Sequence, residues 1–197
     1  MPIDLYLSLV LHVAVGVWSI QSPGVPVSAE RAADYAVAAT YHGERAGVDP
    51  FELVAIARNE SDFAMHLRGP DGKDCGLTQT RITVSRYSCR QLLRSYWLDF
   101  KEAAREMSEY ARACRGHGDY DRCRFNHYNS GARYARHGFH GAYYIRVTCF
   151  AEAARAGLRV DDHCRHARGR RDIARILRRA VPRAKPALMA ASDVPAS

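Results

Sequence analysis

Apolar residues recur along most of the chain with the spacing of a helix, which predicts a mainly helical protein. One helix is expected to begin after Ser28, a favourable N-cap, and to end near Gly47. Others are predicted over residues 82–93, 101–115, 121–129 and 142–156, with glycines at 116, 131 and 157 as stop signals. In the segment 101–115, an apolar stripe should face the core, with the charges on the other side. Little in the pattern demands strands, although the polar loop 67–74 is compatible with a small hairpin.

The strongest start signal lies at residues 49–52. Asp49 suits the N-cap, Pro50 the first helical position, and Glu52 the reciprocal position of a capping box. These residues predict a helix from Pro50 to Glu60.

Glu60 shares a face of this helix with the apolar residues at positions 53, 56 and 57. A carboxyl group on an inward face loses hydration, which raises its pKa toward the range that a general acid needs near neutral pH. The alternative is a hydrogen-bonded or solvated structural glutamate, and the helix taken alone favours that alternative.

The N-terminal segment Leu5–Ile20 is apolar, and His12 is its only residue whose side chain ordinarily titrates near neutral pH. It is shorter than the roughly 20 residues that span a membrane, and it is typical of a signal-peptide core, with Val27-Ser28-Ala29 as a cleavage site. Asp4 and the absence of a basic start argue against this interpretation. A short anchor and a buried helix are the alternatives.

Six cysteines follow the apolar segment, at positions 75, 89, 114, 123, 149 and 164. An even number behind an export-like N-terminus favours disulfides and a periplasmic or secreted protein, with reduced core cysteines as the alternative. Six cysteines allow 15 pairings, of which we favour the nearest neighbours: Cys75–Cys89, Cys114–Cys123 and Cys149–Cys164. No C-x-x-C pair occurs and the histidines do not cluster around the cysteines, so no metal is expected.

Composition shifts toward arginine after Cys164, where Ile173, Ile176 and Leu177 predict a short basic amphipathic helix before Pro182. The last fifteen residues are expected to form a disordered tail. The chain is thus divided into an N-terminal segment (1–27), one compact catalytic domain (28–164) and a basic extension (165–197).

The formal net charge of +8 indicates an anionic partner, such as a wall polymer, a membrane surface or nucleic acid. No zinc-finger spacing, basic zipper or aromatic RNP signature is found. Nucleic acid is therefore not expected, because that interpretation would depend on charge alone.

Four short motifs follow one another in the chain: Glu60-Ser61, Gly76-Leu77-Thr78-Gln79, Tyr128-Asn129-Ser130-Gly131, and Tyr143. In order and spacing they resemble the soluble lytic transglycosylase family, whose pattern is E-S, G-L-M-Q, A-Y-N-A-G and a tyrosine in a late helix. The resemblance spans about residues 28–158, and its specificity lies in the ordered set. It implies a mainly α, lysozyme-like (α+β) domain with a glycan-binding groove and at most a small hairpin.

The resemblance also implies roles for these residues. Glu60 would be the catalytic acid and then base, while substrate-binding roles fall to Ser61, Gln79, Tyr128, Asn129 and Tyr143. Tyr143 matches the late tyrosine better than its neighbour Tyr144, which stays open as an alternative. Each binding residue also has a purely structural interpretation, as a loop, core or capping residue. Thr78 departs from the family's methionine, which puts affinity in doubt more than the reaction.

The implied reaction is cleavage of the β-1,4 bond between N-acetylmuramic acid and N-acetylglucosamine in peptidoglycan. Lytic transglycosylases need one glutamate and no cofactor, and leave a 1,6-anhydromuramic acid end; we expect a monomer. Goose-type lysozymes, more distant relatives, hydrolyse the bond with loop aspartates, for which Asp71 and Asp74 are the candidates here. We favour turn roles for both aspartates. A third hypothesis is a peptidoglycan-binding protein without catalytic activity.

Overall fold

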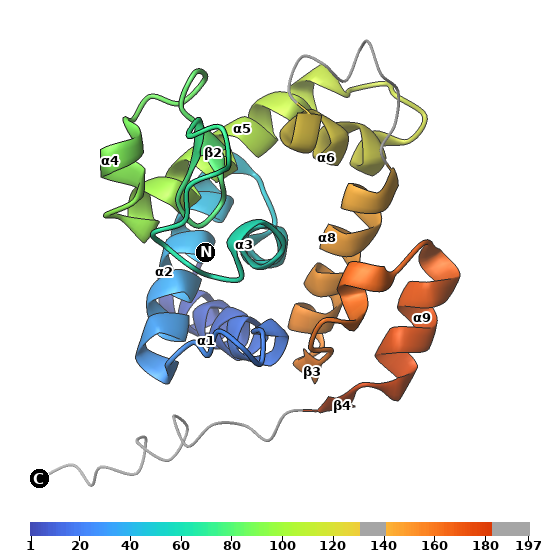
Figure 1. Ribbon diagram of the computed structural model, residues 1–197. Helices are drawn as coiled ribbons and strands as arrows, with labels where there is room; N and C mark the ends of the chain where they lie inside the picture. The colour runs from blue at the N-terminus through green and yellow to red at the C-terminus, as the bar shows by residue number, and fades with distance from the viewer. Residues whose placement is uncertain (131–140, 183–197) are drawn as a thin grey trace, which may run out of the picture.

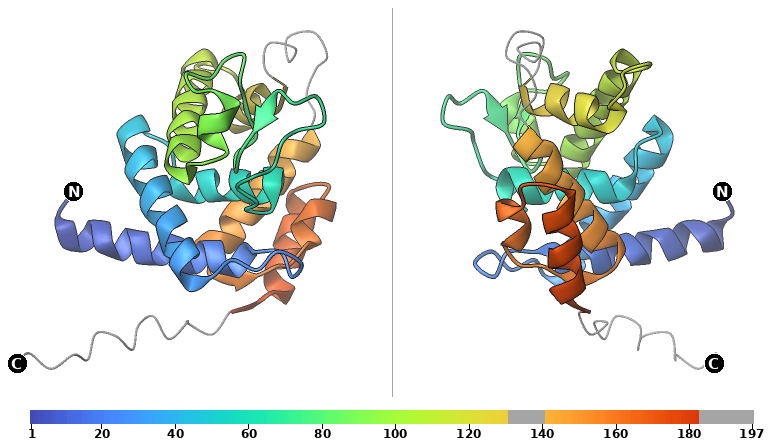
Figure 2. Two further views of the ribbon diagram at one scale, coloured as in Figure 1. Left: turned by 60° about the vertical axis from the view of Figure 1, so that its left-hand side comes forward. Right: turned by 90° about the vertical axis from the view of Figure 1, so that its right-hand side faces the viewer.

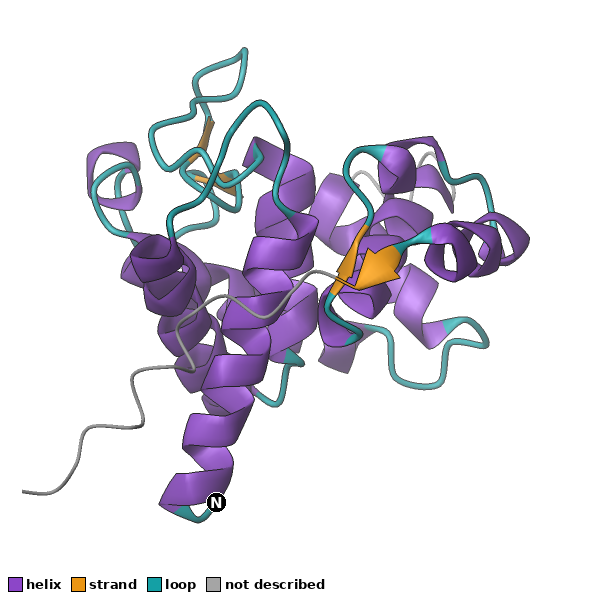
Figure 3. Ribbon diagram, turned by 90° about the horizontal axis from the view of Figure 1, so that it is seen from below, coloured by secondary structure: helices purple, strands orange, loops and turns teal. Residues whose placement is uncertain are grey.

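The computed structural model describes residues 1–130 and 141–182, so Gly131 and the expected tail at 183–197 lie outside the described residues. These residues form eight α-helices, a 3-10 helix and two short antiparallel strand pairs (Figure 3). The mainly helical fold class is confirmed. The elements are α1 Ile3–Ile20, α2 Ala29–Ala46, α3 Pro50–Ser61, β1 Asp74–Cys75, β2 Thr80–Arg81, α4 Cys89–Leu92, α5 Tyr96–Ala113, α6 Tyr120–Ser130, α8 Gly141–Arg155, β3 Leu158–Arg159, η2 His163–His166, α9 Arg170–Arg179 and β4 Val181–Pro182.

Helix α3 lies at the centre of the molecule and contacts α1, α2, α5 and α8 (Figure 1). It begins as predicted, because the Asp49 carboxylate accepts a hydrogen bond from the Phe51 amide at 2.9 Å. The predicted capping box is wrong, since Glu52 turns away from the cap and binds the Arg124 guanidinium of α6 at 2.6 Å. This buried ion pair joins the central helix to α6.

The predicted helices also form at α2, α6, α8 and α9. The Ser28 hydroxyl caps α2 by accepting a hydrogen bond from the Arg31 amide at 3.1 Å, and Gly47 ends that helix with a φ of +68°. Helix α5 begins five residues earlier than expected, at Tyr96, because the Ser95 hydroxyl accepts from the Leu98 amide.

The helix predicted over residues 82–93 is wrong except at its end, where α4 forms over four residues. Ser88 starts α4 through a capping box with Gln91. Before it, the Arg86 amide donates to the Glu102 carboxylate of α5 at 3.1 Å, and the Tyr87 amide donates to the Ser85 hydroxyl. These side-chain acceptors take amides that a helix would have used.

The sequence pattern led us to expect the charged side chains of α5 on the face away from the core, and this expectation is wrong for some of them. Asp99, Glu102 and Glu106 are buried together with Ala103 and Met107 of the apolar stripe. Helix α5 therefore carries carboxyl groups into the interior of the protein.

The C-terminal half of α1 belongs to the core. Val13, Val17 and Ile20 are fully buried, and the Ile20 carbonyl accepts a hydrogen bond from the buried Arg58 guanidinium at 2.5 Å. The first residues of α1 extend away from the other helices (Figure 2), and the apolar side chains before Val10 are mostly exposed. Among the described residues, α1 is the one helix whose length and composition would allow it to cross a membrane.

Three disulfides form, and they are the nearest-neighbour pairs expected from the sequence: Cys75–Cys89, Cys114–Cys123 and Cys149–Cys164. Their Cα–Cα distances of 5.5, 5.9 and 5.5 Å are ordinary for such bonds. Three disulfides and an apolar N-terminal helix are consistent with a location outside the cytoplasm.

Candidate functional site

Glu60 and Ser61 occupy the last turn of α3, where the central helix meets the loop that leads to the β1–β2 hairpin. Glu60 is half-buried and Ser61 is buried. The Ser61 hydroxyl donates toward two carbonyl oxygens, that of Leu77 at 2.7 Å and that of Ala57 at 3.1 Å. Ser61 therefore attaches the hairpin loop, residues 76–79 between β1 and β2, to α3, and it does not present its hydroxyl to a ligand.

The backbone on both sides of this position adopts conformations that residues with side chains rarely take. Asp62 and Phe63, immediately after α3, have φ values of +55° and +65°, and Gln79 in the hairpin loop has +48°. A positive φ costs a non-glycine residue free energy, and such residues cluster at functional sites. Three of the four found in the described residues lie around Glu60 and the loop facing it.

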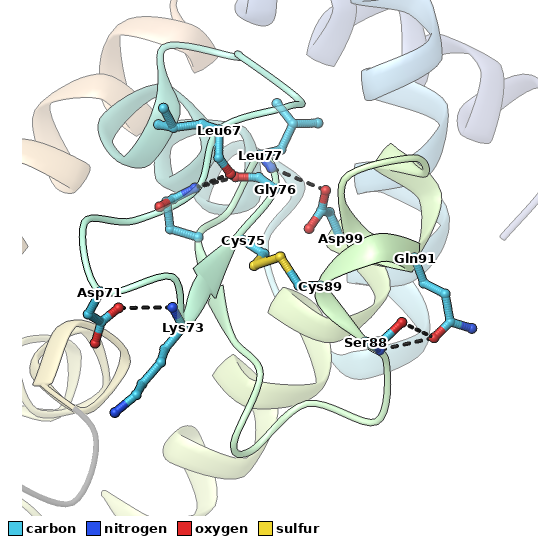
Figure 4. The surroundings of a disulfide bond; sticks show 11 residues. Leu67, Asp71, Lys73, Cys75, Gly76, Leu77, Ser88, Cys89, Gln91 and Asp99 are labelled. Atoms are coloured by element: carbon cyan, nitrogen blue, oxygen red, sulfur yellow. Dashed lines mark hydrogen bonds between the residues drawn. A yellow bond between two sulfur atoms is a disulfide. The ribbon is translucent and has the colours of Figure 1, made fainter.

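Asp99 of α5 lies beside the hairpin loop and holds it in place (Figure 4). Its carboxylate Oδ2 accepts a hydrogen bond from the Leu77 amide at 3.1 Å. A Cβ atom on Gly76 would lie 2.2 Å from the other carboxylate oxygen, so only glycine fits there, with its φ of +82°. The Cys75–Cys89 disulfide fixes the same loop covalently to α4.

The polar side chains of this loop are largely used inside it. Thr78 is buried, and its hydroxyl pairs with that of Thr80 at 3.0 Å. The Gln79 amide nitrogen donates to the carbonyls of Gly76, at 2.8 Å, and Leu67, at 3.1 Å. The amide nitrogen of Gln79 thus has the structural role that was the alternative to substrate binding, and only the amide oxygen is left for a ligand.

Two tyrosines close the site from α6 and α8. The Tyr128 hydroxyl donates to the Thr78 carbonyl at 3.0 Å, and Tyr143 is buried beside Glu60. Tyr144 instead accepts a hydrogen bond from Arg170 at 2.7 Å, so the structure places Tyr143 at the site. Asn129 is exposed and lies within 3.4 Å of the Ser130 hydroxyl.

Burial raises the pKa of Glu60 above that of an ordinary glutamate. The Tyr143 hydroxyl, the Asn59 amide and the Arg146 guanidinium act in the opposite direction, and Asp74 adds to the rise. The Tyr143 hydroxyl forms no hydrogen bond of regular geometry within the described chain, yet it lies close enough to Glu60 to affect its pKa. The Arg146 Nε donates to the Asn59 amide oxygen at 3.0 Å, which holds both groups in place.

Asp71 and Asp74 are both paired with one arginine. Arg81 lies 3.2 Å from each carboxylate, and the Asp71 carboxylate also accepts a hydrogen bond from the Lys73 amide at 2.9 Å. This amide and the nearby Arg81 lower the pKa of Asp71. Asp71 lies in a turn, as we had favoured, but the turn role expected for Asp74 is wrong, because Asp74 lies in strand β1 and pairs with Arg81 of β2. Asp74 is close enough to Glu60 to raise its pKa.

Two carboxyl groups of α5 belong to the same region and were missed in the sequence. Burial raises the pKa of Asp99 to about 8 and that of Glu106 to about 7. Glu106 lies close to Tyr128, whose own pKa is raised by burial and then by Glu106 and Glu60. Asp99 and Glu106 are seven residues apart, on the helix face that also carries Ala103. The same helical spacing singled out Glu60.

The only group of metal-ligating side chains found in residues 1–130 and 141–182 consists of Cys114, Cys123 and His127. Both cysteines are bonded to each other and so offer no thiolates.

Comparison with protein-family models, with curated proteins and with solved structures finds no match to this chain. The interpretation of the site therefore depends on its own residues.

Proposed function

We propose that this protein cleaves the β-1,4 bond between N-acetylmuramic acid and N-acetylglucosamine in bacterial peptidoglycan, within a lysozyme-like domain. The observation that carries this proposal is Glu60, a half-buried carboxyl group of raised pKa at the end of the central helix, with Tyr143 beside it. A carboxyl group whose pKa is raised keeps its proton to higher pH and can protonate the oxygen of a leaving sugar. The resemblance of the four sequence motifs to lytic transglycosylases supports the same reaction.

In the proposed reaction, Glu60 transfers its proton to the glycosidic oxygen as the bond to C1 of the muramic acid sugar breaks. The acetamido group of that sugar stabilises the positive charge that develops at C1. The Glu60 carboxylate then accepts the proton of the C6 hydroxyl, whose oxygen bonds to C1 and forms a 1,6-anhydro ring. Water is not consumed, and Glu60 ends in its protonated form.

The pairing of the loop aspartates favours this outcome over hydrolysis. A hydrolase of the two-carboxylate type needs a second carboxylate to activate water or to attack C1. Asp71 and Asp74 are both paired with Arg81, and the Lys73 amide together with Arg81 lowers the pKa of Asp71. Hydrolysis by Glu60 with Asp74 is the alternative reaction, because Asp74 lies near enough to Glu60 to raise its pKa.

The other motif residues act chiefly as supports in this proposal. Ser61 holds the hairpin loop to α3, Tyr128 holds it to α6, and Tyr143 sets the environment of the Glu60 carboxyl group. Gln79 keeps its amide oxygen for the sugar, and Asn129 is exposed to solvent.

The remaining properties of the chain agree with a wall substrate. Three disulfides and the apolar α1 are consistent with the compartment in which peptidoglycan is found. The net charge of +8 favours adsorption to an anionic wall. A protein that binds the wall without cleaving it would share both properties, so a test has to separate binding from turnover.

The test is to compare Glu60→Gln with the wild type in the release of soluble fragments from dye-labelled sacculi. Glu109→Gln, at an exposed glutamate of α5, is the matched control for loss of one carboxylate. We expect Glu60→Gln to lose at least ~100-fold in rate, the scale of a general acid, while both variants still sediment with sacculi. Equal rates in all three proteins would overturn the enzymatic proposal and leave a binding protein.

A further inference from the structure

A cavity of about 550 Å³ lies between the β3–η2 segment and α9, and none of its lining residues belongs to the candidate glycan site. Its volume is in the range of small-molecule binding sites. Arg159, His163 and His166 line one side, and Arg175 and Arg179 of α9 line the other. All five side chains offer N–H donors.

The acceptors in this cavity are already used. Two carboxylates line it, and each is occupied by an arginine: Asp161 by the Arg159 Nε at 2.8 Å, and Asp172 by the Arg175 Nη2 at 2.6 Å. Arg179 forms no ion pair in the part of the chain that the structure describes. Because a guanidinium has five N–H donors, most donors of Arg159, Arg175 and Arg179 have no protein acceptor among the described residues, and these side chains are exposed to solvent. The cavity therefore fits an anion with several acceptor oxygens.

The wall of the cavity is fixed to the protein core. Asp161 has a φ of +43°, and its carbonyl accepts a hydrogen bond from the Arg58 Nη2 at 3.3 Å. Arg58 is fully buried in α3, and the Cys149–Cys164 disulfide attaches η2 to α8. The backbone of this wall is therefore held in place, which lowers the cost of ordering it when a ligand binds, whereas the arginine side chains are exposed.

We propose that this cavity binds a small phosphate-bearing ligand, with its phosphate between Arg179 and Arg175. Arginine matches the geometry of phosphate oxygens, and residues 159–180 carry eight arginines against three aspartates. Val160, Ile176 and Ala180 also line the cavity and supply an apolar surface for the rest of the ligand. A sugar phosphate and a phosphorylated lipid headgroup both have this chemistry. The proposal is independent of glycan cleavage by Glu60.

The experiment titrates the full chain, with its disulfides intact, with pyrophosphate and with a hexose phosphate by calorimetry. Arg179→Gln is compared with Arg178→Gln, which removes an exposed arginine beside it that does not line the cavity. We expect saturable binding that weakens roughly tenfold in Arg179→Gln, the cost of one charge-assisted hydrogen bond. In Arg178→Gln the affinity should change less than about twofold, as expected for a solvent-exposed, screened charge that does not line the cavity.

Equal weakening by both substitutions would overturn the proposal, because it would show diffuse attraction to a basic surface. The absence of saturable binding of both probes, or citrate binding as tightly as pyrophosphate, would overturn it too. Vesicles that contain phosphatidic acid distinguish the sources of the phosphate. Binding to them that is lost in Arg179→Gln but kept in Arg178→Gln supports a lipid headgroup, whereas hexose phosphate binding without vesicle binding supports a soluble ligand.

Discussion

Replacing Asp99 with asparagine should stabilise the protein, and the gain should grow with pH. Asp99 is fully buried beside the hairpin loop, and desolvation raises its pKa from 3.8 to about 8. One carboxylate oxygen accepts from the Leu77 amide, and the other has no hydrogen-bond partner among the residues that the structure describes. Asparagine keeps an acceptor for Leu77 and removes the group that ionises.

The sign follows from the protons bound in each state. As pH rises from about 4 to 8, the unfolded chain releases the Asp99 proton while the folded protein still holds it. The free energy of unfolding of the wild type therefore falls across this window and levels off above it. At about 1.4 kcal/mol for each pH unit, the fall reaches about 4 kcal/mol by pH 7, an upper limit because local relaxation eases ionisation.

The assay is urea unfolding at a series of pH values from 4 to 8 under non-reducing conditions, for the wild type and Asp99→Asn. Asp4→Asn, at an exposed aspartate in the first turn of α1, is the control. We expect the difference in unfolding free energy between wild type and Asp99→Asn to be smallest at pH 4 and largest near pH 8. Parallel pH profiles for the two proteins would refute the argument that Asp99 is held in its neutral form.

Three further substitutions test neighbouring parts of the account. Tyr143→Phe removes a hydroxyl that lowers the pKa of Glu60, so the basic limb of the pH–activity profile should move to higher pH; an unmoved limb would contradict contact between the two groups. In the wild type, Glu106 should lower the free energy of unfolding by about 3 kcal/mol between pH 4.5 and 7. Glu106→Gln should abolish this fall, measured by the same unfolding series. Gly16→Val should destabilise by about 2 kcal/mol, because a Cβ there would lie 2.9 Å from the Ala154 carbonyl oxygen, whereas Gly24→Val, with open space around it, should cost little. Equal urea midpoints for the two glycine variants would show that α1 does not pack into the core.

The helices that the sequence predicted correctly are those whose ends are encoded locally. Asp49 and Pro50 start α3, and Gly47 and Gly157 adopt the left-handed conformation that ends a helix. The predictions were wrong where a group distant in the sequence binds the backbone amide or side chain that the local pattern had assigned to a helix or a cap. Glu52 pairs with Arg124, 72 residues away, and no local pattern contains that partner.

Part of the candidate site was likewise predictable from the sequence, and part was not. The helical spacing that placed Glu60 on the apolar face of α3 led to a half-buried carboxyl group with a raised pKa. The sequence already favoured Tyr143 over Tyr144, and the packing of α8 separates the two, because adjacent residues on a helix point in different directions. Gln79 combines internal side-chain hydrogen bonds with a positive φ, and no composition rule would have indicated either.

The measurement that tests the central claim most directly is the mass spectrum of fragments released by the purified protein from intact sacculi. If Glu60 works alone as acid and then base, the released muramic acid ends are 1,6-anhydro sugars, one water lighter than reducing sugars, and Glu60→Gln releases almost none. Reducing ends would contradict the non-hydrolytic reaction and assign the second step to water. A complete absence of released fragments from the folded wild type would contradict glycan cleavage itself.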